Sequence, residues 1–262
     1  EETTGRLNAA SCGDFGGPEE AAMTTPRRRH VDIPDASRYS RRDFLAGTGV
    51  TGAAIIAPAF VPMKVSAAPP VAEARMLPAP TKEGGMPLMQ ALGLRRSTRE
   101  FSARKIPEQV LSDLLWAAYG VNRPTGDRTA PCWRHIIVID VYAAMEDGLW
   151  LYDPKRHALV PHPAGDIRAQ TGQQEFAGRA PLNLVYVANG ARMSELTPEN
   201  RKLYCSVDSA FIGQNVYLYC ASAGLATVFR GAVDYPRLAR AMRLDHDQFV
   251  AFAQTVGYPK EA

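Results

Sequence analysis

The sequence predicts an α+β fold. Segments whose apolar residues recur with helical spacing are interspersed with short runs rich in β-branched residues, and they do not follow the regular strand–helix order of an α/β protein. No internal repeat is visible in the 262 residues. Hydrophobic residues make up 46% and charged residues 22% of the chain, which is ordinary for a globular protein.

The first part of the expected domain is an arm followed by a short helix. The arm, over residues 69–87, is rich in proline and has few periodic apolar residues, so we expect it to run over the surface or over a partner subunit. The helix covers residues 88–94, with Leu88, Leu92 and Met89 expected to face inward.

A second helix is predicted after Ile106-Pro107-Glu108, because proline suits the first helical turn. Gly120 is expected to end it. Its inward positions follow helical spacing and are Val110, Leu111, Leu114, Leu115 and Ala118.

Strands are predicted in the middle of the chain. The run 136–142 is rich in β-branched residues. Residues 149–152 and 158–160 flank the turn sequence 153–156 and predict a hairpin. Residues 182–188 predict a buried strand.

The last third of the chain predicts two helices and a strand. Residues 207–223 are apolar on nearly all sides and end at Gly224, which predicts a helix at the centre of the domain. Residues 235–244 predict an amphipathic helix, and residues 249–256 a final strand. The helix is expected to expose Arg237, Arg240 and Arg243.

Residues 1–68 are expected to be a leader, and residues 69–262 the folded domain. The stretch before Ser40 shows no apolar period and is expected to be disordered. Ser40-Arg41-Arg42-Asp43-Phe44-Leu45 is similar to the twin-arginine export motif, and the moderately apolar run after it leads to the small residues Ser66-Ala67-Ala68, which suit cleavage. The motif predicts the twin-arginine export machinery as a partner and a periplasmic or other extracytoplasmic location. The alternative is a membrane tether, because residues 44–63 are about long enough to span a bilayer.

Charge and cysteine content exclude some classes of function. A formal charge of +3, without a stripe of basic and aromatic residues, predicts no nucleic-acid partner. The four cysteines show no metal-site spacing, so no metal is predicted. If Cys205 and Cys220 share one helix, they lie about 22 Å apart, which is too far for a disulfide.

The segment from Leu94 to Phe101 carries the richest chemistry. Three arginines and two hydroxyl residues fall within five positions, which are Arg95, Arg96, Ser97, Thr98 and Arg99. Guanidinium groups bind phosphate through paired hydrogen bonds, and hydroxyls add donors. On this segment alone, a phosphate site and a solvated basic helix end both remain open.

Arg95-Arg96-Ser97-x-Arg99-x-Phe101 resembles the opening motif of the nitroreductase family. Later segments resemble the same family in the same order. Residues 114–120 and 128–131 are similar to the branch that contains the thiazoline oxidases of peptide maturation, and residues 207–225 are similar to the central helix of the family. The segments 224–228 and 256–260 resemble its closing parts, so the resemblance covers residues 87–260.

The resemblance implies a central mixed sheet with flanking helices, FMN as cofactor, and a homodimer that completes two flavin sites across its interface. Arg95, Ser97 and Lys260 would hold the FMN phosphate. Arg99 would lie near the pyrimidine ring, where a cation stabilises the negative charge that develops on reduction. Gln174 would lie near the polar edge of the ring.

Other positions would complete the flavin site. Arg230 and Gly231 would lie in the loop that covers the other face of the ring. A second subunit would contribute three residues, Pro131, Cys132 and His135. The remaining implied cofactor-binding residues are Arg96, Val228 and Phe229.

The implied function is two-electron transfer between a small-molecule donor and an acceptor, with the chemistry on FMN and only a tuning role for Arg99. Because nicotinamides are scarce outside the cytoplasm, the expected donor is a quinol, a redox protein or the oxidised substrate itself. One segment departs from the family, since Cys132, His135 and Ile137 stand where Ser, Asn and Gln are frequent. The alternative function is therefore an exported flavin- or ligand-binding module without turnover.

Overall fold

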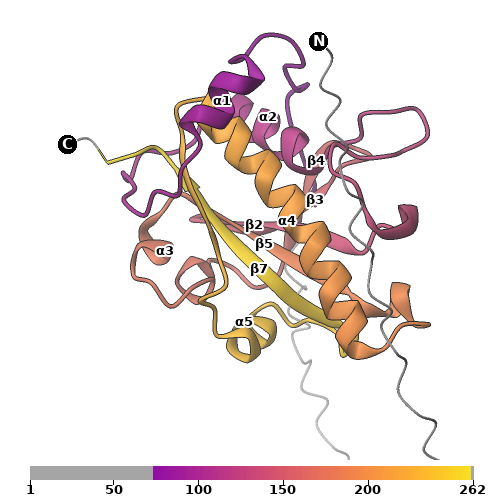
Figure 1. The fold of residues 1–262 in the computed structure, drawn as a ribbon. Helices are drawn as coiled ribbons and strands as arrows, with labels where there is room; N and C mark the ends of the chain where they lie inside the picture. The colour runs from indigo at the N-terminus through magenta and orange to yellow at the C-terminus, as the bar shows by residue number, and fades with distance from the viewer. Residues whose placement is uncertain (1–72, 261–262) are drawn as a thin grey trace, which may run out of the picture. The chain divides into compact units, whose positions relative to one another are not determined.

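A seven-stranded sheet organises the described part of the chain, with helices on both of its faces (Figure 1). The computed structural model describes residues 73–260, so the leader and export motif predicted over residues 1–68 lie outside the described residues. The strands follow the order β1-β4-β3-β2-β5-β7-β6. This arrangement confirms the α+β prediction of a central sheet with flanking helices.

The strands are β1 (Arg75–Met76), β2 (Ile139–Met145), β3 (Gly148–Asp153), β4 (Ala158–His162), β5 (Leu182–Asn189), β6 (Ala226–Arg230) and β7 (Gln248–Gly257). The α-helices are α1 (Leu88–Leu94), α2 (Glu108–Tyr119), α3 (Phe176–Arg179), α4 (Pro198–Ser222) and α5 (Tyr235–Ala241). Short 3-10 turns are η2 (Trp133–His135), η3 (Arg168–Gln170) and η4 (Gly190–Met193).

The direction of the strands differs from the mixed sheet that was expected. Each pairing between neighbouring strands of the described residues is antiparallel. The reason is the connectivity, because β2, β3 and β4 form consecutive hairpins and β7 runs back between β5 and β6. The hairpin predicted around residues 153–156 is confirmed.

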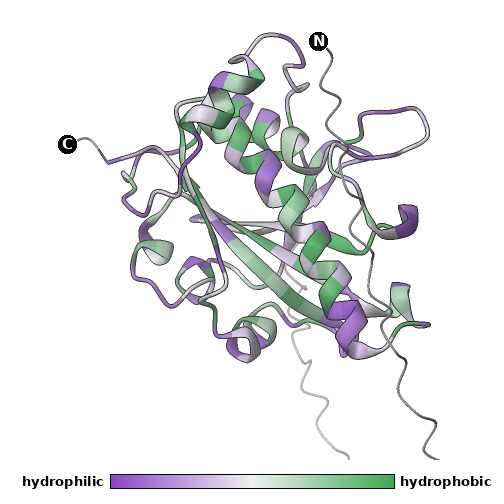
Figure 2. Ribbon diagram, in the orientation of Figure 1, coloured by the Kyte–Doolittle hydropathy of each residue, from purple (hydrophilic) through white to green (hydrophobic). Residues whose placement is uncertain are grey.

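Strand β5 forms the centre of the core because both of its faces are covered. Leu184 and Tyr186 pack in the cluster that includes residues of α2 and α4, whereas Val185 and Val187 pack in the cluster that includes Leu238 of α5. Burying each such apolar side chain stabilises the fold by about 1.5–3 kcal/mol. Hydrophobic residues accordingly concentrate in the sheet in Figure 2.

Helix α2 agrees with its sequence pattern. It begins after Pro107 and ends at Gly120. Four of its five expected inward residues are buried, and Val110 is half-buried.

Helix α4 begins nine residues before its predicted start at Val207. Thr197 caps it by accepting a hydrogen bond from the Asn200 backbone N–H at 3.3 Å, and Pro198 occupies the first helical position. This first turn is hydrophilic (Figure 2), so it lacks the apolar period on which the prediction depended. Cys205 and Cys220 both lie on α4, are buried and are free thiols.

The expected orientation of α1 is wrong. Leu88 and Met89 are 61% and 78% exposed, Leu92 is also exposed, and Ala91 is the buried residue. The helix has only seven residues and rests on α4, so one narrow side suffices for the contact. The exposed apolar residues of α1 therefore lie on a side of the helix that no other described residues cover.

Smaller differences follow from local backbone geometry. Strand β2 begins at Ile139 rather than at residue 136, because Arg134 and His135 have φ values of 48° and 60° and form η2. Helix α5 ends at Ala241 rather than at residue 244, and Arg243 has a φ of 50°. The arm contributes the edge strand β1, which was not predicted.

A partly buried chain of hydrogen bonds ties the arm to the sheet. Ser112 Oγ donates to the Pro78 carbonyl at 2.6 Å, so it accepts from His157 Nε2 at 2.7 Å. His157 Nδ1 then accepts from the Tyr152 hydroxyl at 3.0 Å. The neutral imidazole satisfies both neighbours, and burial holds the pKa of His157 below its usual range.

We expect this histidine to make stability depend on pH. The unfolded chain binds a proton at His157 near pH 6.5, whereas the folded chain resists it. The contribution of neutral His157 to the free energy of unfolding is therefore complete above about pH 6.5 and is lost as the pH falls below that value. Melting temperatures measured from pH 8 to pH 5 should decline at the acidic end.

His157→Asn is the matched variant for this measurement, because asparagine tolerates the φ of 49° at this position. The acidic decline should become shallower in the variant. It should not vanish, since burial also lowers the pKa of His162. An unchanged decline would contradict the assignment to His157.

Candidate functional site

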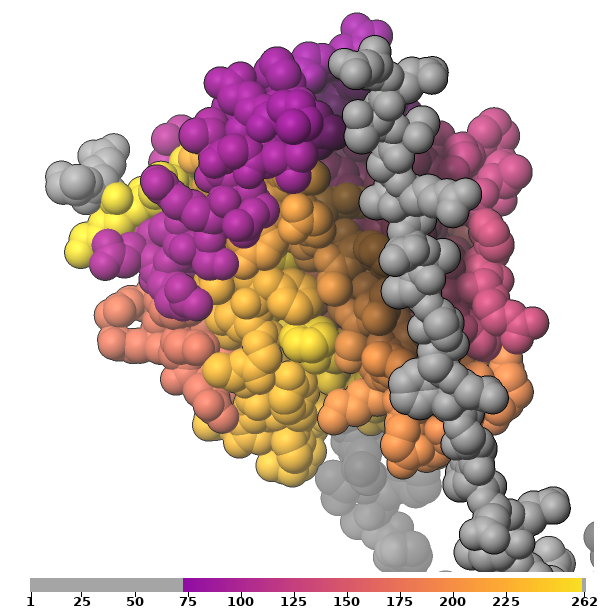
Figure 3. All heavy atoms as spheres, in the orientation of Figure 1, coloured from indigo at the N-terminus to yellow at the C-terminus, as the bar shows by residue number. Residues whose placement is uncertain are grey.

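Two distant segments of the chain join beside a cavity. Phe101 forms an antiparallel bridge with Pro259, the Ser102 N–H donates to the Tyr258 carbonyl at 3.0 Å, and the Lys260 N–H donates to the Glu100 carbonyl at 3.3 Å. Figure 3 shows the indigo and yellow segments lying against each other. The adjoining cavity of about 380 Å³ is lined by Arg99, Glu100, Phe101, Phe176, Arg179 and Lys260. The predicted pair Arg99 and Lys260 thus lines a single cavity.

Tyr217 of α4 organises the rest of the basic segment. Its hydroxyl lies 2.7 Å from Ser97 Oγ and accepts the Phe229 backbone N–H at 2.9 Å. The Arg95 guanidinium lies 5.2 Å from the centre of the Tyr217 ring. Arg96 lines a neighbouring cavity of about 290 Å³, which Tyr217 also lines.

Sequence reasoning missed the role of Tyr217. The residue lies in a segment similar to the central helix of the nitroreductase family, but helical spacing does not reveal what a tyrosine hydroxyl meets in another part of the chain. Only the approach of Ser97 and β6 to α4 defines that role.

The cations of this region are available to an anion. Within residues 73–260, no carboxylate lies within ion-pair distance of Arg95, Arg96, Arg99 or Lys260. Unpaired cations close together repel one another and favour a bound anion. The smaller cavity has a net positive lining, because Arg99, Arg179 and Lys260 outnumber Glu100, and such a lining favours an anion.

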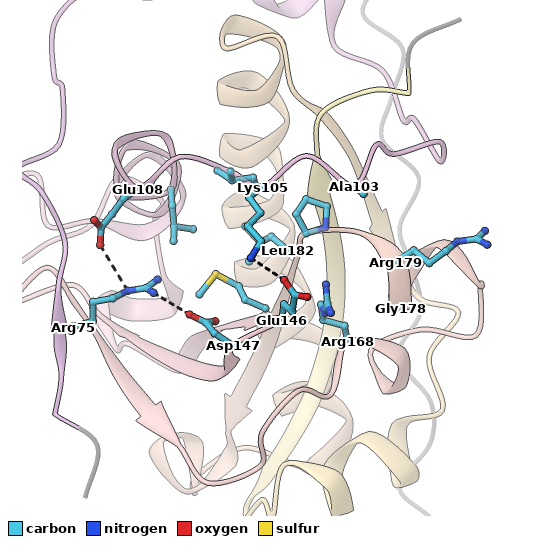
Figure 4. Close-up of a pocket in the computed structure, with 14 residues that line it drawn as sticks. Arg75, Ala103, Lys105, Glu108, Glu146, Asp147, Arg168, Gly178, Arg179 and Leu182 are labelled. Carbon is cyan, nitrogen blue, oxygen red and sulfur yellow. Dashed lines mark hydrogen bonds and ion pairs between the residues drawn. The ribbon is translucent and has the colours of Figure 1, made fainter. Parts of the chain in front are cut away.

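A second, larger cavity lies next to the first and shares Arg179 with it (Figure 4). Its volume is about 800 Å³. Here the cations are paired: Arg75 lies 3.1 Å from Asp147, and Lys105 lies 3.1 Å from Glu146. Because carboxylates already neutralise these charges, this cavity is less suited to a phosphate than the smaller one.

Gln174 precedes α3, whose Phe176 lines the smaller cavity and packs on Phe101 with ring centres 5.5 Å apart. The Gln174 Oε1 atom is buried and has no hydrogen-bond partner in the described residues. Leaving such an acceptor unpaired costs about 1–3 kcal/mol. Five other buried polar side-chain atoms of residues 73–260 also lack a partner, and Gln174 itself does not line the smaller cavity, so this atom alone does not identify a ligand.

Strand β6 carries three of the predicted site residues, and Gly231 follows it directly. Val228 is buried, and Phe229 packs on Tyr186 and Phe252. Arg230 is not in a covering loop but ends β6, where only 4% of the residue is exposed. Gly231, just after the strand, is exposed.

Pro131, Cys132 and His135 lie apart from this site within one chain. Their loop rests on the first half of α4, where the Trp133 N–H donates to Asp208 Oδ2 at 3.0 Å. Asp208 precedes Tyr217 by nine helical positions, which corresponds to about 13 Å along the helix. Pro131 and His135 are exposed, and burial raises the pKa of the half-buried Cys132 thiol.

Among residues 73–260, no group of three or more His, Cys, Asp or Glu side chains is arranged to hold a metal ion. None of the helices in the same range is long and apolar enough to cross a membrane.

Comparisons with known proteins agree with the fold. The profile described as "Nitroreductase family" matches residues 93–258. A crystal structure from Ralstonia eutropha JMP134, described as a nitroreductase, has 45% identity and a TM-score of 0.70, covering 74% of this chain and 93% of that one. A nitroreductase named in Methanocaldococcus jannaschii is 30% identical over 148 residues, covering 53% of this chain and 75% of that protein.

A more distant structure from Anabaena variabilis ATCC 29413, also described as a nitroreductase, shares the fold. It has 19% identity and a TM-score of 0.58, covering 66% of this chain and 38% of that one. With most of the described domain inside the family match and the fold in agreement, this chain belongs to the nitroreductase family.

Proposed function

We propose that this protein is an exported FMN-dependent oxidoreductase that transfers two electrons between a donor and an acceptor. The observation that carries the proposal is the cavity lined by both Arg99 and Lys260, neither of which forms an ion pair with a carboxylate of the described residues. The implied site residue Gln174 lies two residues before Phe176, which lines the same cavity. Nitroreductases are typically FMN-dependent oxidoreductases, in keeping with the family of this chain.

The side chains divide the work of binding. Arg95, Ser97 and Lys260 would hold the phosphate through charge-assisted hydrogen bonds, and of these three Lys260 lines the smaller cavity. Gln174 would accept a hydrogen bond from the pyrimidine edge of the ring and so orient it. Arg99 would place a positive charge beside that edge and so stabilise the negative charge gained on reduction. FMN, when bound, supplies the electron-accepting and electron-donating chemistry.

Two measurements test this function. Purified protein should show flavin absorbance or take up FMN, and the bound flavin should be reduced anaerobically and reoxidised by an acceptor. Bound flavin that undergoes no turnover would favour the alternative, a flavin- or ligand-binding module, which the altered loop at Cys132, His135 and Ile137 motivates. Protein that takes up no FMN would exclude both functions.

The proposal includes a homodimer, since nitroreductases are generally homodimers. Leu203, Val207 and Phe211 are spaced four residues apart on α4 and are exposed in the single chain. A continuous exposed apolar stripe is typical of a protein interface. Association through this stripe would let one subunit offer Pro131, Cys132 and His135 to the flavin of the other.

Phe211→Asp is expected to disrupt this dimer. Phe211 is 45% exposed, and a carboxylate within an apolar contact would be desolvated without a partner. The dimer dissociation constant should rise by about 100-fold or more, and FMN occupancy should fall with it. Sedimentation velocity over a concentration series measures the first quantity, and absorbance measures the second.

Arg240→Asp is the control, because Arg240 is exposed on α5, away from the stripe. It should remain dimeric. If the Phe211→Asp protein is dimeric and flavin-loaded like the parent, the interface lies elsewhere.

We propose export from the similarity of residues 40–45 to the twin-arginine motif. That route carries folded proteins, which suits a domain loaded with cofactor before export. Fractionation of cells that produce the Arg41→Lys/Arg42→Lys variant should move the protein from the periplasmic fraction to the cytoplasm. Wild-type protein in the membrane fraction would favour a tether over residues 44–63.

The place within the family and the donor are also proposals. The segments at residues 114–120 and 128–131 support a relationship to the thiazoline oxidase branch. Export supports a quinol, a redox protein or the substrate as donor. Rapid turnover of NADPH by protein that resides in the cytoplasm would contradict this donor class.

A further inference from the structure

Arg230 is a buried cation whose described partners are all uncharged. Its Nε donates to Thr255 Oγ1 at 3.0 Å, its Nη1 to the Thr171 carbonyl at 3.0 Å, and its Nη2 to Asn183 Oδ1 at 2.9 Å. No carboxylate of residues 73–260 forms an ion pair with it. The guanidinium is therefore hydrogen-bonded but not neutralised.

Such an arrangement lowers the stability of the folded protein. Removing a cation from water without a counter-charge is penalised by several kcal/mol, even when its hydrogen bonds are made. Burial lowers the pKa of Arg230 to about 10, which still leaves the side chain charged at neutral pH. The core of the domain thus retains a permanent positive charge.

The guanidinium holds the segment that carries Gln174. It binds the Thr171 carbonyl before Gln174 and lies 5.8 Å from the ring centre of Phe176 after it. Gly172 leaves room for this contact, because a Cβ there would overlap Arg230 Nη1. The Gln173 N–H donates to the Ala232 carbonyl at 3.0 Å, just beyond β6.

The charge also lies close to the candidate flavin cavity. The Phe176 ring contacts the guanidinium and lines the cavity that Arg99 and Lys260 share. A buried charge is screened by salt far less than an exposed one. The charge of Arg230 can therefore raise the electrostatic potential in the cavity, although the Phe176 ring lies between them.

We propose that Arg230 is a positioning residue that fixes the Gln174–Phe176 segment and whose unneutralised charge favours the reduced, anionic flavin over the oxidised one. This inference rests on the proposed function. A hydride delivered by a donor carries two electrons and one proton, so the donor is oxidised and the bound ring system becomes more negative by one charge. A nearby fixed cation stabilises that state selectively.

The test compares the affinities of the two redox states. Apoprotein is titrated anaerobically with oxidised FMN and with dithionite-reduced FMN. Loosening of the segment weakens both states alike, whereas loss of the charge weakens the reduced state more. The informative quantity is the ratio of the dissociation constants, reduced over oxidised.

Three variants separate charge from packing. Arg230→Met removes the charge, Arg230→Lys keeps it with fewer donors, and Asn183→Asp places a carboxylate on Arg230 Nη2 while the guanidinium remains. For a charge one aromatic ring behind the cavity wall, with an effective dielectric constant of about 20, the ratio should rise about tenfold in Arg230→Met and Asn183→Asp. It should stay near the wild-type value in Arg230→Lys.

The outcomes are distinct. A wild-type ratio in both Arg230→Met and Asn183→Asp would overturn the proposal even if each binds FMN more weakly. If circular dichroism shows that Arg230→Met does not fold, Asn183→Asp decides, because it retains the acceptor for the guanidinium. A failure of the proposed function looks different, since wild-type protein would then bind neither redox state, and the inference would fall with it.

Discussion

Replacing Lys260 with alanine is expected to raise the dissociation constant of FMN by about 10- to 100-fold while leaving that of riboflavin nearly unchanged. Riboflavin lacks the phosphate, so the comparison isolates the contact that Lys260 is proposed to make. A hydrogen bond to a charged group contributes about 1.5–3 kcal/mol, which corresponds to this range. The Lys260 backbone bond to Glu100 does not depend on the side chain and should persist.

Fluorescence titration of apoprotein with both flavins measures the effect. Lys155→Ala is the matched control, because Lys155 is exposed in the turn between β3 and β4. Arg99→Ala should behave differently and weaken both flavins, since Arg99 is assigned to the ring. Equal weakening of FMN and riboflavin by Lys260→Ala would remove this lysine from the phosphate site.

Gly213→Ala is expected to lower the free energy of unfolding by about 1–3 kcal/mol. Gly213 lies where α4 crosses the sheet, and a Cβ there would lie 2.5 Å from Phe229 Cδ2. Phe229 packs between Tyr186 and Phe252, so its ring has little room to yield. The strain opposes the gain in helix propensity of about 1 kcal/mol that alanine brings.

Gly93→Ala is the matched control, because Gly93 is also helical and a Cβ there would meet nothing within 4 Å. The same substitution should leave stability unchanged or raise it by up to about 1 kcal/mol. Urea denaturation at one fixed protein concentration measures both variants. A Gly213→Ala protein as stable as the Gly93→Ala protein would show that α4 can move away from β6.

Sequence periodicity predicts the bounds of those elements whose apolar residues face the core of the same chain. Helix α2 and the β3–β4 hairpin are such elements, and their bounds agree closely with the structure. Periodicity could not orient α1, because Leu88 and Met89 are apolar yet exposed. Exposed apolar residues on a helix can show the same helical spacing as apolar residues that face the core.

The candidate site was predictable only in part. The clustered arginines of residues 95–99 indicate an anion site by composition, and resemblance to the family added Lys260 from the far end of the chain. Neither source could place Arg230 inside the core, because a strand position does not reveal what lies behind it. The Tyr217 hydroxyl was missed for a related reason, since its partners come from segments distant in sequence.

Residues 100–102 pair with residues 258–260, so the two segments that form this junction are synthesised at different times. Arg99 leaves the ribosome about 160 residues before Lys260. At 5–20 residues per second, this interval is roughly ten to thirty seconds. During that interval a nascent chain has Arg99 without Lys260, so a cofactor that needs both residues, as proposed, would bind only after the last strand has been released. A premature stop codon directly before Lys260 would yield a protein that keeps most of its core but lacks the lysine proposed to bind the phosphate.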